Sequence, residues 1–274
     1  MSPLPAAPGQ LPEIERSELD VEMLRRGIRG NGAVVVRGLF DGHTTDDLRA
    51  SVSSAYSAYD RWKATGELEP DDPWLDLAPI GNPRHRSVRS FNREGGGVFA
   101  FDSPRAAFVL TDALVSYGIR DLAAEYLQAP PVLTIEKTTL RTIGPDAQVD
   151  HGWHQDGAFM GPDNPALNIW IALSDCGTDA PSMKFVPHRL DGIVPTGTDG
   201  AAFSWTVSPT EVSRALRGVE AQTVSFMPGD AIFFDEVTLH STATTPTMTK
   251  PRMAIEAWMF GARKPAYDRL PLVL

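Results

Sequence analysis

The chain contains 274 residues, of which 42% are hydrophobic and 22% are charged, a balance typical of a soluble globular protein. Its formal net charge of −10 disfavours nucleic acid as a partner, because binding to nucleic acid depends on cationic side chains that neutralise phosphates. The single cysteine, Cys176, excludes an intramolecular disulfide, and no apolar run reaches the length of a membrane span. We therefore expect a cytoplasmic protein, monomeric or homodimeric, that acts on a small molecule and binds neither nucleic acid nor membrane.

The first half of the chain predicts helices, loops and one strand. Residues 1–14 contain several prolines and little apolar pattern, so we expect a flexible tail. The stretch 60–104 is rich in Pro, Gly and charged residues, which predicts a long loop. Apolar periodicity and one β-branched run define the other elements. These are a helix over 18–32, a strand over 33–40, a helix over 44–62, and helices over 104–117 and 119–128.

The second half of the chain predicts short β-strands that are separated by turn residues. Its β-branched and aromatic runs cover 132–143, 166–175, 182–189, 221–243 and 252–260. One interruption, 208–218, predicts a helix, because it begins with a capping box and ends at a glycine. This order favours a sandwich or barrel with the N-terminal helices packed on one face. We expect one domain over 15–274, with a helical and loop-rich part over 15–131 and a β core over 132–262.

The stretch GWHQDGAFMG places His154 and Asp156 two residues apart. On an extended strand, residues two apart lie on the same face, so both side chains can reach one metal ion while Gln155 points away. Of the six histidines, only His154 is followed two positions later by a carboxylate. By itself the pair is weak evidence for a metal site and is better explained as a polar strand end with a capping aspartate.

The C-terminal β run adds a second histidine and an arginine. His240 ends an apolar strand, and Arg252 opens the strand RMAIEAWMF after a turn-rich linker. Two histidines and one carboxylate on one face of a metal leave three positions open, which is the arrangement of non-haem Fe(II) oxygenases. A guanidinium at the head of a neighbouring strand can hold the distal carboxylate of a bidentate co-substrate through paired hydrogen bonds, which lysine cannot reproduce.

Four motifs resemble the phytanoyl-CoA dioxygenase family of Fe(II)- and 2-oxoglutarate-dependent oxygenases. They are WHQDGAFMG, LNIWIALSDC with VPHR after it, PGDAIFFDEVTLHST and KPRMAIEAW, and they cover roughly Leu133 to Phe260. The segment LRRGIRGNGAVVVRGLF also resembles the N-terminal helix and strand of that family. The resemblance implies an α+β, mainly β fold whose core is a double-stranded β-helix, a cupin-like jelly-roll. Where the family usually has the sequence Pro-Gly-Ser-His, this chain has VPHRLDG. This difference leaves the candidate metal ligands unchanged but affects the local loop and therefore the pocket wall.

By this resemblance His154, Asp156 and His240 are the iron ligands, and Arg252 anchors 2-oxoglutarate. Thr242 matches a family Ser or Thr that supports the same carboxylate.

Two further residues match the family's co-substrate region. Trp170 matches an aromatic residue near the co-substrate, and Thr139 lies on a strand that lines the site in this family. Alternation along that strand places Lys137 and Arg141 on the same face as Thr139.

The resemblance implies Fe(II), the co-substrate 2-oxoglutarate and O2, with hydroxylation of an unactivated carbon and release of succinate and CO2. We expect a specialised, natural-product metabolite as the substrate, with a coenzyme A thioester as the alternative. Desaturation, epoxidation and ring formation use the same cofactors and stay open. A carboxylate at Asp156 disfavours a halogenase. A jelly-roll that only binds a ligand is the non-enzymatic alternative.

The substrate walls are expected to come from the loop 60–97 and the insertion 191–218, because loops carry specificity. The first loop holds a basic cluster that either offsets neighbouring acidic residues or binds an anionic substrate. Its members are Arg84, His85, Arg86, Arg89 and Arg93, and the acidic residues are Asp71, Asp72 and Asp76.

Other polar and apolar residues near the motifs receive structural interpretations. We expect His188 to be structural and His151 to lie at the pocket rim or on the surface. Apolar side chains are expected to keep the site dry, and the candidates are Trp153, Phe159, Trp170 and Phe233.

Overall fold

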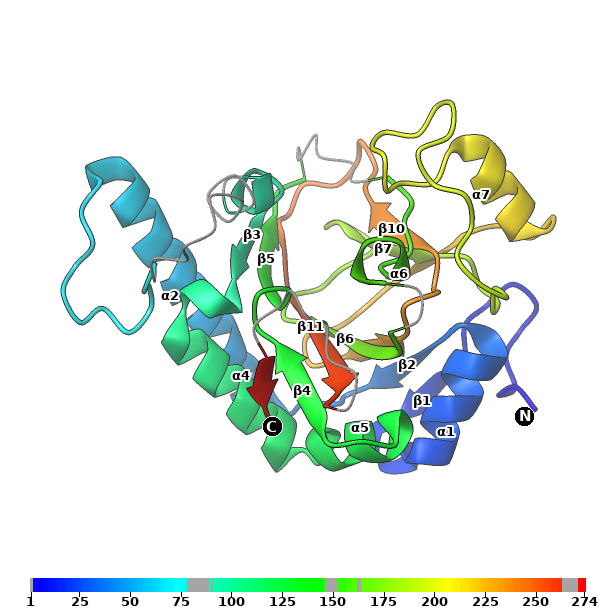
Figure 1. Cartoon of the computed structure of the whole chain (residues 1–274), viewed down its shortest axis with the longest axis horizontal. Helices are drawn as coiled ribbons and strands as arrows, with labels where there is room; N and C mark the ends of the chain where they lie inside the picture. The colour runs from blue at the N-terminus through cyan, green and yellow to red at the C-terminus, as the bar shows by residue number, and fades with distance from the viewer. Residues whose placement is uncertain (1, 78–88, 90, 146–151, 162–163, 263–270) are drawn as a thin grey trace.

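The computed structural model describes residues 2–77, 89, 91–145, 152–161, 164–262 and 271–274. Two sheets face each other, and helices cover the outer side of the larger one (Figure 1). This arrangement is the expected jelly-roll core with helices on one face.

Within the described residues, the larger sheet has nine strands. Their order is β1-β2-β9-β6-β11-β4-β12, with β5 paired to β11 and β3 paired to β5. All pairs are antiparallel except β1 with β2. The strands are β1 (Glu13–Glu15), β2 (Ala33–Arg37), β3 (Gly97–Phe99), β4 (Pro131–Thr134), β5 (Thr139–Ile143), β6 (Ala166–Ala172), β9 (Ala231–Phe234), β11 (Arg252–Gly261) and β12 (Pro271–Val273).

The smaller sheet has three antiparallel strands in the order β10-β7-β8. They are β7 (Ser182–Phe185), β8 (Gln222–Val224) and β10 (His240–Ala243). Their inward side chains, including Phe185 and Val224, pack against the inner face of the larger sheet.

Strand β9 and the first four residues of β2 are apolar throughout because both of their faces are buried. On β9, Phe233 packs toward the helices, whereas Phe234 packs between the two sheets. On β2, Val34 likewise packs toward the helices, and Val35 packs between the two sheets. Side chains alternate along a strand, so burial of both faces favours an unbroken apolar run.

The helices lie where apolar periodicity predicts them. The expected helix over 18–32 is formed by η1, α1 and the π-helix η2, and Leu24 and Ile28 bury its apolar side. Asp41 caps α2 by accepting a hydrogen bond from Thr44 N at 2.8 Å. Among the described helices, none combines the length and apolarity needed to cross a membrane. The helices are η1 (Arg16–Glu18), α1 (Val21–Arg25), η2 (Arg26–Asn31), α2 (Gly42–Thr65), η3 (Ala100–Asp102), α4 (Pro104–Ser116), α5 (Ile119–Leu127), α6 (Gly157–Met160) and α7 (Pro209–Leu216).

The N-terminal segment differs from the expected flexible tail over 1–14. Leu4 and Leu11 are buried, and the side chain of Asn31 bonds the backbone N–H and C=O of Leu4. β1 then pairs with β2, so the segment extends the edge of the larger sheet. Sequence periodicity misses this docking because two isolated leucines show no repeat.

The expected strand over 132–143 is two strands, β4 and β5. Between them Lys137 N and Thr138 N both donate to Thr134 O, which closes a turn. Lys137 therefore lies in the turn and not on a strand face shared with Thr139 and Arg141.

We predict that Phe233→Ala lowers the free energy of unfolding by about 3 to 5 kcal/mol, because it removes a fully buried ring and leaves a cavity. Phe108→Ala is the control, since that ring on α4 is 59% exposed and its loss should cost about 0.5 kcal/mol or less. Chemical denaturation of both variants beside the native protein measures the difference. Equal transition midpoints for the two variants would contradict the assigned core.

Candidate active site

A backbone bridge joins the two histidines of the predicted triad. His154 N donates to His240 O at 2.9 Å, and His240 N donates to His154 O at 3.0 Å. The two ring centroids lie 4.4 Å apart. The bridge fastens the segment 152–161 to the first residue of β10, at the smaller sheet.

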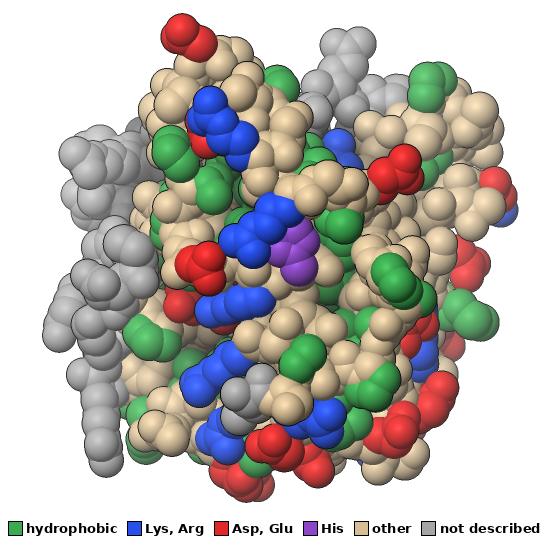
Figure 2. All heavy atoms as spheres, turned by 90° about the vertical axis from the view of Figure 1, so that its right-hand side faces the viewer, with side chains coloured by type: hydrophobic (Ala, Val, Ile, Leu, Met, Phe, Trp, Pro, Cys, Tyr) green, Lys and Arg blue, Asp and Glu red, His purple; other side chains and the backbone are tan. Residues whose placement is uncertain are grey.

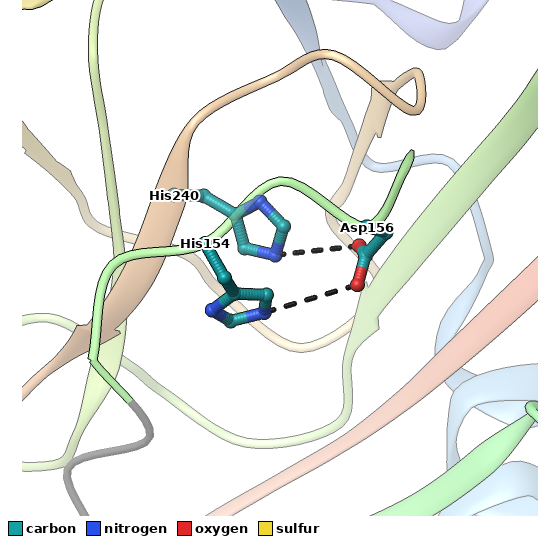
Figure 3. A group of neighbouring side chains, drawn as sticks. All are labelled: His154, Asp156 and His240. Carbon is teal, nitrogen blue, oxygen red and sulfur yellow. Dashed lines mark ion pairs between the residues drawn. The ribbon is translucent and has the colours of Figure 1, made fainter. Parts of the chain in front are cut away.

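Asp156 completes the cluster. Its Oδ1 lies 3.8 Å from Nε2 of His154, and its Oδ2 lies 3.6 Å from Nε2 of His240 (Figure 3). The three candidate ligand atoms lie within 4.8 Å of one another. No other group of three metal-ligating side chains was found within the part of the chain that the structure describes.

Backbone carbonyls orient both imidazoles. Nδ1 of His154 lies 3.0 Å from Gly152 O, and Nδ1 of His240 lies 3.0 Å from Thr238 O. A carbonyl only accepts, so each Nδ1 carries a proton, which leaves each Nε2 as the ring atom that faces Asp156. This tautomer is the one that neutral histidine uses to bind a metal through Nε2.

The electrostatics of the cluster fit a bound cation. Burial raises the pKa of Asp156 to about 6, and burial together with His240 lowers the pKa of His154 well below its usual value. Asp156 Oδ2 is buried and has no hydrogen-bond partner among the described residues. A divalent metal would supply the missing partner, and two neutral imidazoles with one carboxylate are a donor set suited to Fe(II).

The local geometry differs from the extended strand expected for His154 and Asp156. Asp156 has helical dihedrals, φ −66° and ψ −26°, and precedes the short helix α6. This turn brings the backbone of residue 157 close to Glu236. Only glycine fits there, because a Cβ would lie 2.8 Å from the carbonyl oxygen of Glu236. His240 likewise begins a strand, not ends one. The side chains converge through this turn and the bridge, not through strand alternation.

Gln155 points away from the cluster, as expected, and has a role that the sequence did not reveal. Its Nε2 donates to Gly192 O at 2.9 Å and to Val237 O, and its Oε1 accepts from Val194 N at 2.7 Å. These bonds attach the triad segment to the insertion over 191–218. The sequence signal that could have indicated this role is the position of a polar residue between two candidate metal ligands.

The triad opens into a cavity of about 310 Å³, which all seven sequence-predicted site residues line. Arg252 at the head of β11 is 1% exposed, and its Nη1 donates to Ser182 O at 2.8 Å. Among the described residues, its Nε has no hydrogen-bond partner and no carboxylate lies within ion-pair distance of it. Burial lowers its pKa to about 10. An uncompensated buried guanidinium is costly and fits a ligand carboxylate.

The three other predicted contacts, Trp170, Thr242 and Thr139, line the same cavity as Arg252. The Trp170 ring centroid lies 5.4 Å from Cζ of Arg252, and its buried Nε1 has no partner among the described residues. Thr242 on β10 and Thr139 on β5 also line the cavity. The Thr139 hydroxyl donates to Lys137 O at 3.0 Å.

A partly buried ion pair inside the cavity was missed from the sequence. Arg141 Nη2 lies 3.0 Å from Glu256 Oε2, and Trp258 Nε1 donates to Glu256 Oε1 at 3.0 Å. Burial opposes ionisation of Glu256, but Arg141 and Lys137 outweigh it and lower the pKa to about 2. Counting by twos from Arg252 along β11 places Glu256 on the same face, so alternation was the overlooked signal.

The expected apolar shell is partly wrong. Phe159 and Trp170 line the cavity, but Phe233 packs toward the helices because its neighbour Phe234 takes the inward face. Trp153 packs in a separate cluster beside the insertion. His188 lies outside both the cavity lining and the ligand cluster.

The basic cluster of the first loop is described only in part. Arg89 pairs with Asp102, and Arg93 pairs with Asp60 at 2.7 Å. Both guanidiniums are therefore used within the fold. Arg84, His85, Arg86 and the rim candidate His151 lie outside the described residues. Elsewhere, Figure 2 shows a face on which Lys and Arg side chains are interspersed with Asp and Glu.

The family model described as phytanoyl-CoA dioxygenase (PhyH) matches residues 28–254. The chain belongs to this phytanoyl-CoA dioxygenase family. The match includes the triad and Arg252, so family membership agrees with the resemblance carried by the four motifs. No curated protein matches the sequence of this family member.

Solved structures similar to this phytanoyl-CoA dioxygenase family member share its fold. The epimerase SnoN in complex with Fe3+, alpha ketoglutarate and nogalamycin RO is 21% identical, with 90% of this chain and 86% of that chain covered and a TM-score of 0.58. The carbocyclase SnoK from nogalamycin biosynthesis is 16% identical, with 91% and 87% covered and a TM-score of 0.59. EctD from S. alaskensis with 2-oxoglutarate and 5-hydroxyectoine is 14% identical, with 85% and 73% covered and a TM-score of 0.58.

We predict that His154→Ala and His240→Ala each weaken Fe(II) binding at least about tenfold, because two remaining ligands hold the metal poorly. His43→Ala is the matched control, since that side chain on α2 is 84% exposed. Anaerobic equilibrium dialysis measures the affinity. Native affinity in either triad variant would remove that histidine from the metal site.

Proposed function

We propose that this chain is an Fe(II)- and 2-oxoglutarate-dependent oxygenase that hydroxylates an unactivated carbon of a small, specialised metabolite. The observation that carries the proposal is that the triad converges on one cavity with the buried Arg252, which pairs with no carboxylate of the described residues. Neither feature is explained by packing. A metal at one and a carboxylate at the other would satisfy both.

His154, Asp156 and His240 would hold the iron through two Nε2 atoms and a carboxylate oxygen. Arg252 would hold the distal carboxylate of 2-oxoglutarate, with Thr242, Trp170 and Thr139 as neighbouring contacts in the cavity. When bound, iron and 2-oxoglutarate use O2 to oxidise an unactivated C–H bond, with release of succinate and CO2.

The chain's own contribution is position and dryness. The carbonyls of Gly152 and Thr238 fix the imidazoles, and the aromatic rings of Phe159 and Trp170 line the cavity beside them. Exclusion of water strengthens the polar contacts in the site and limits side reactions. The Arg141–Glu256 pair adds no net charge to this cavity.

The same site supports a second candidate outcome, stereochemical inversion or ring formation with the same cofactors. Two similar structures are an epimerase and a carbocyclase, and this favours keeping both reactions beside desaturation and epoxidation. A coenzyme A thioester is less favoured, because Arg89 and Arg93 are already paired with Asp102 and Asp60.

Succinate formation tests the proposed function directly. The protein is incubated with Fe(II), ascorbate, 2-oxoglutarate and candidate metabolites, and products are analysed by mass. A gain of one oxygen supports hydroxylation, a loss of two hydrogens supports desaturation or ring formation, and an unchanged mass with a new isomer supports epimerisation. Failure to form succinate with any candidate, together with absent binding of Fe(II) and 2-oxoglutarate, would leave the jelly-roll binding module.

We predict that Arg252→Lys raises the 2-oxoglutarate concentration required for half-maximal succinate formation at least about tenfold, while Fe(II) affinity stays near native. Lysine keeps the charge but loses the planar donor pair. Lys250→Ala is the control, because its Nζ contacts only Asp179 at an exposed position in the described structure. An unchanged requirement would direct the search to Lys137 or Arg141.

We predict that the native protein gives no halogenated product in chloride or bromide, because the Asp156 carboxylate occupies a metal position and adds negative charge. Asp156→Gly should lose most oxygenase activity and regain some Fe(II) binding at high chloride. Product masses from both proteins, with one identified substrate, provide the measurement. Halogenation by the native protein, or full hydroxylation by the variant, would show that Asp156 is not a ligand.

A further inference from the structure

Four aromatic side chains form a continuous contact series beside the triad. Phe91 meets Phe203 edge-on at 6.1 Å, Phe203 stacks on Trp205 at 5.3 Å, and Trp205 meets Phe159 edge-on at 5.7 Å between ring centroids. We call Phe91, Phe159, Phe203 and Trp205 the aromatic wall. Its members come from three separate segments of the chain, so only the tertiary structure assembles it.

Trp205 is the centre of the aromatic wall. Its ring lies 5.4 Å from the His154 ring at an interplanar angle of 86° and is nearly parallel to Phe203, at 3°. Trp205, Phe159 and Phe91 line the cavity, whereas Phe203 does not. Phe203 therefore supports Trp205 from behind and leaves the indole beside the candidate metal site.

The segment that carries Trp205 is held in place by hydrogen bonds. The hydroxyl of buried Thr206 accepts from Phe203 N at 2.8 Å and donates to Phe203 O at 2.9 Å. Val207 N donates to Trp153 O at 2.8 Å, which ties the segment to the strand bridge next to His154. The indole is thus positioned in advance, and a ligand that stacks on it does not have to order the loop.

The aromatic wall reaches from the triad to solvent. Phe91 is 45% exposed and Phe203 is 38% exposed, while Trp205 and Phe159 are half-buried. Contiguous exposed apolar surface at the rim of a cavity marks a binding site more often than a structural need. At its inner end, Lys137 Nζ lies 4.2 Å from the Phe159 ring centroid, so an ammonium covers part of that ring. Trp205 lines the cavity beside His154, and among the described residues no cation lies over its ring, so we take it as the aromatic surface for a ligand.

The size of the cavity limits how a substrate can lie. About 310 Å³ is at the lower end of the range for small-molecule sites, and 2-oxoglutarate would take part of it. A substrate must then place an edge near the triad and its remaining area along the aromatic wall toward the mouth. A flat ring system meets this condition with the most stacking contact and the least loss of conformational entropy.

We propose that the aromatic wall selects substrates that carry a flat aromatic or polycyclic ring, which stacks on Trp205 and directs its edge carbons toward the metal. Trp205 is the specificity-determining residue, and Phe203 is a positioning residue that acts through it. This inference rests on the proposed function for the identity of the metal and co-substrate. It assigns the substrate class that the proposed function leaves open.

The test compares two probes of equal carbon skeleton, 2-naphthol and its saturated counterpart 2-decalol. Each is titrated by calorimetry into the anaerobic protein loaded with Fe(II) and 2-oxoglutarate. The native protein should bind 2-naphthol about two- to tenfold more tightly than 2-decalol, which is the effect expected of one aromatic stacking contact. Equal affinity for the two probes would overturn the proposal.

Variants locate the preference. Trp205→Leu should abolish it, Trp205→Phe should retain most of it, and Phe203→Leu should weaken it without loss of Fe(II) binding. Trp62→Leu is the matched control, because that indole contacts Tyr59 on α2 and lies outside the cavity lining. If Trp205→Leu does not fold, Trp205→Phe and Phe203→Leu still provide the comparison. A native preference in Trp205→Leu or Phe203→Leu, or its loss in Trp62→Leu, contradicts the assignment.

Failure of this inference and failure of the proposed function give different results. Binding of Fe(II) and 2-oxoglutarate is measured on the same preparations before the probes are added. Native binding of both without a preference for 2-naphthol rejects the aromatic wall as a selector and leaves the oxygenase proposal in place. Absent binding of Fe(II) and 2-oxoglutarate rejects the oxygenase proposal whatever the probes do.

Discussion

The backbone bridge between His154 and His240 is the constraint on which the rest of the site depends. It brings two distant parts of the chain within hydrogen-bond distance and fixes the backbone positions from which both imidazoles extend. The carbonyls of Gly152 and Thr238 then fix the rotation of the rings. With both rings held, one helical turn at Asp156 is enough to complete a three-ligand cluster. The precision of the site thus comes from backbone pairing, which does not depend on flexible side chains.

The same site carries charges that the fold does not balance. Asp156 Oδ2 and Arg252 Nε are buried without hydrogen-bond partners among the described residues. Such groups destabilise a folded protein unless a ligand compensates them, and ligands that bind only the folded state stabilise it. The Arg141–Glu256 pair in the same cavity is compensated internally. This contrast indicates that Asp156 and Arg252 bind ligands, whereas the Arg141–Glu256 pair has a structural role in the cavity lining.

Alternation on strands explains both the successes and the errors of prediction. It correctly placed Thr139 and Arg141 together. Applied to β11, it would also have placed Glu256, four residues after Arg252, on the same face as Arg252. It could not decide between Phe233 and Phe234, because β9 is buried on both faces and is apolar at every position. The tail and the turn at Lys137 were missed because each depends on a few long-range or backbone contacts with no sequence period.

The sequence by itself determined the family, the helices, the apolar strands and the residues of the triad with Arg252, because residue type, order and local periodicity carry that information. The tertiary structure decided how those residues meet. The turn at Asp156, the attachment of Gln155 to the insertion and the aromatic wall around Trp205 all join segments that are far apart in the chain. Such contacts are fixed by the packing of whole elements, and no local pattern records which side chains the packing brings together.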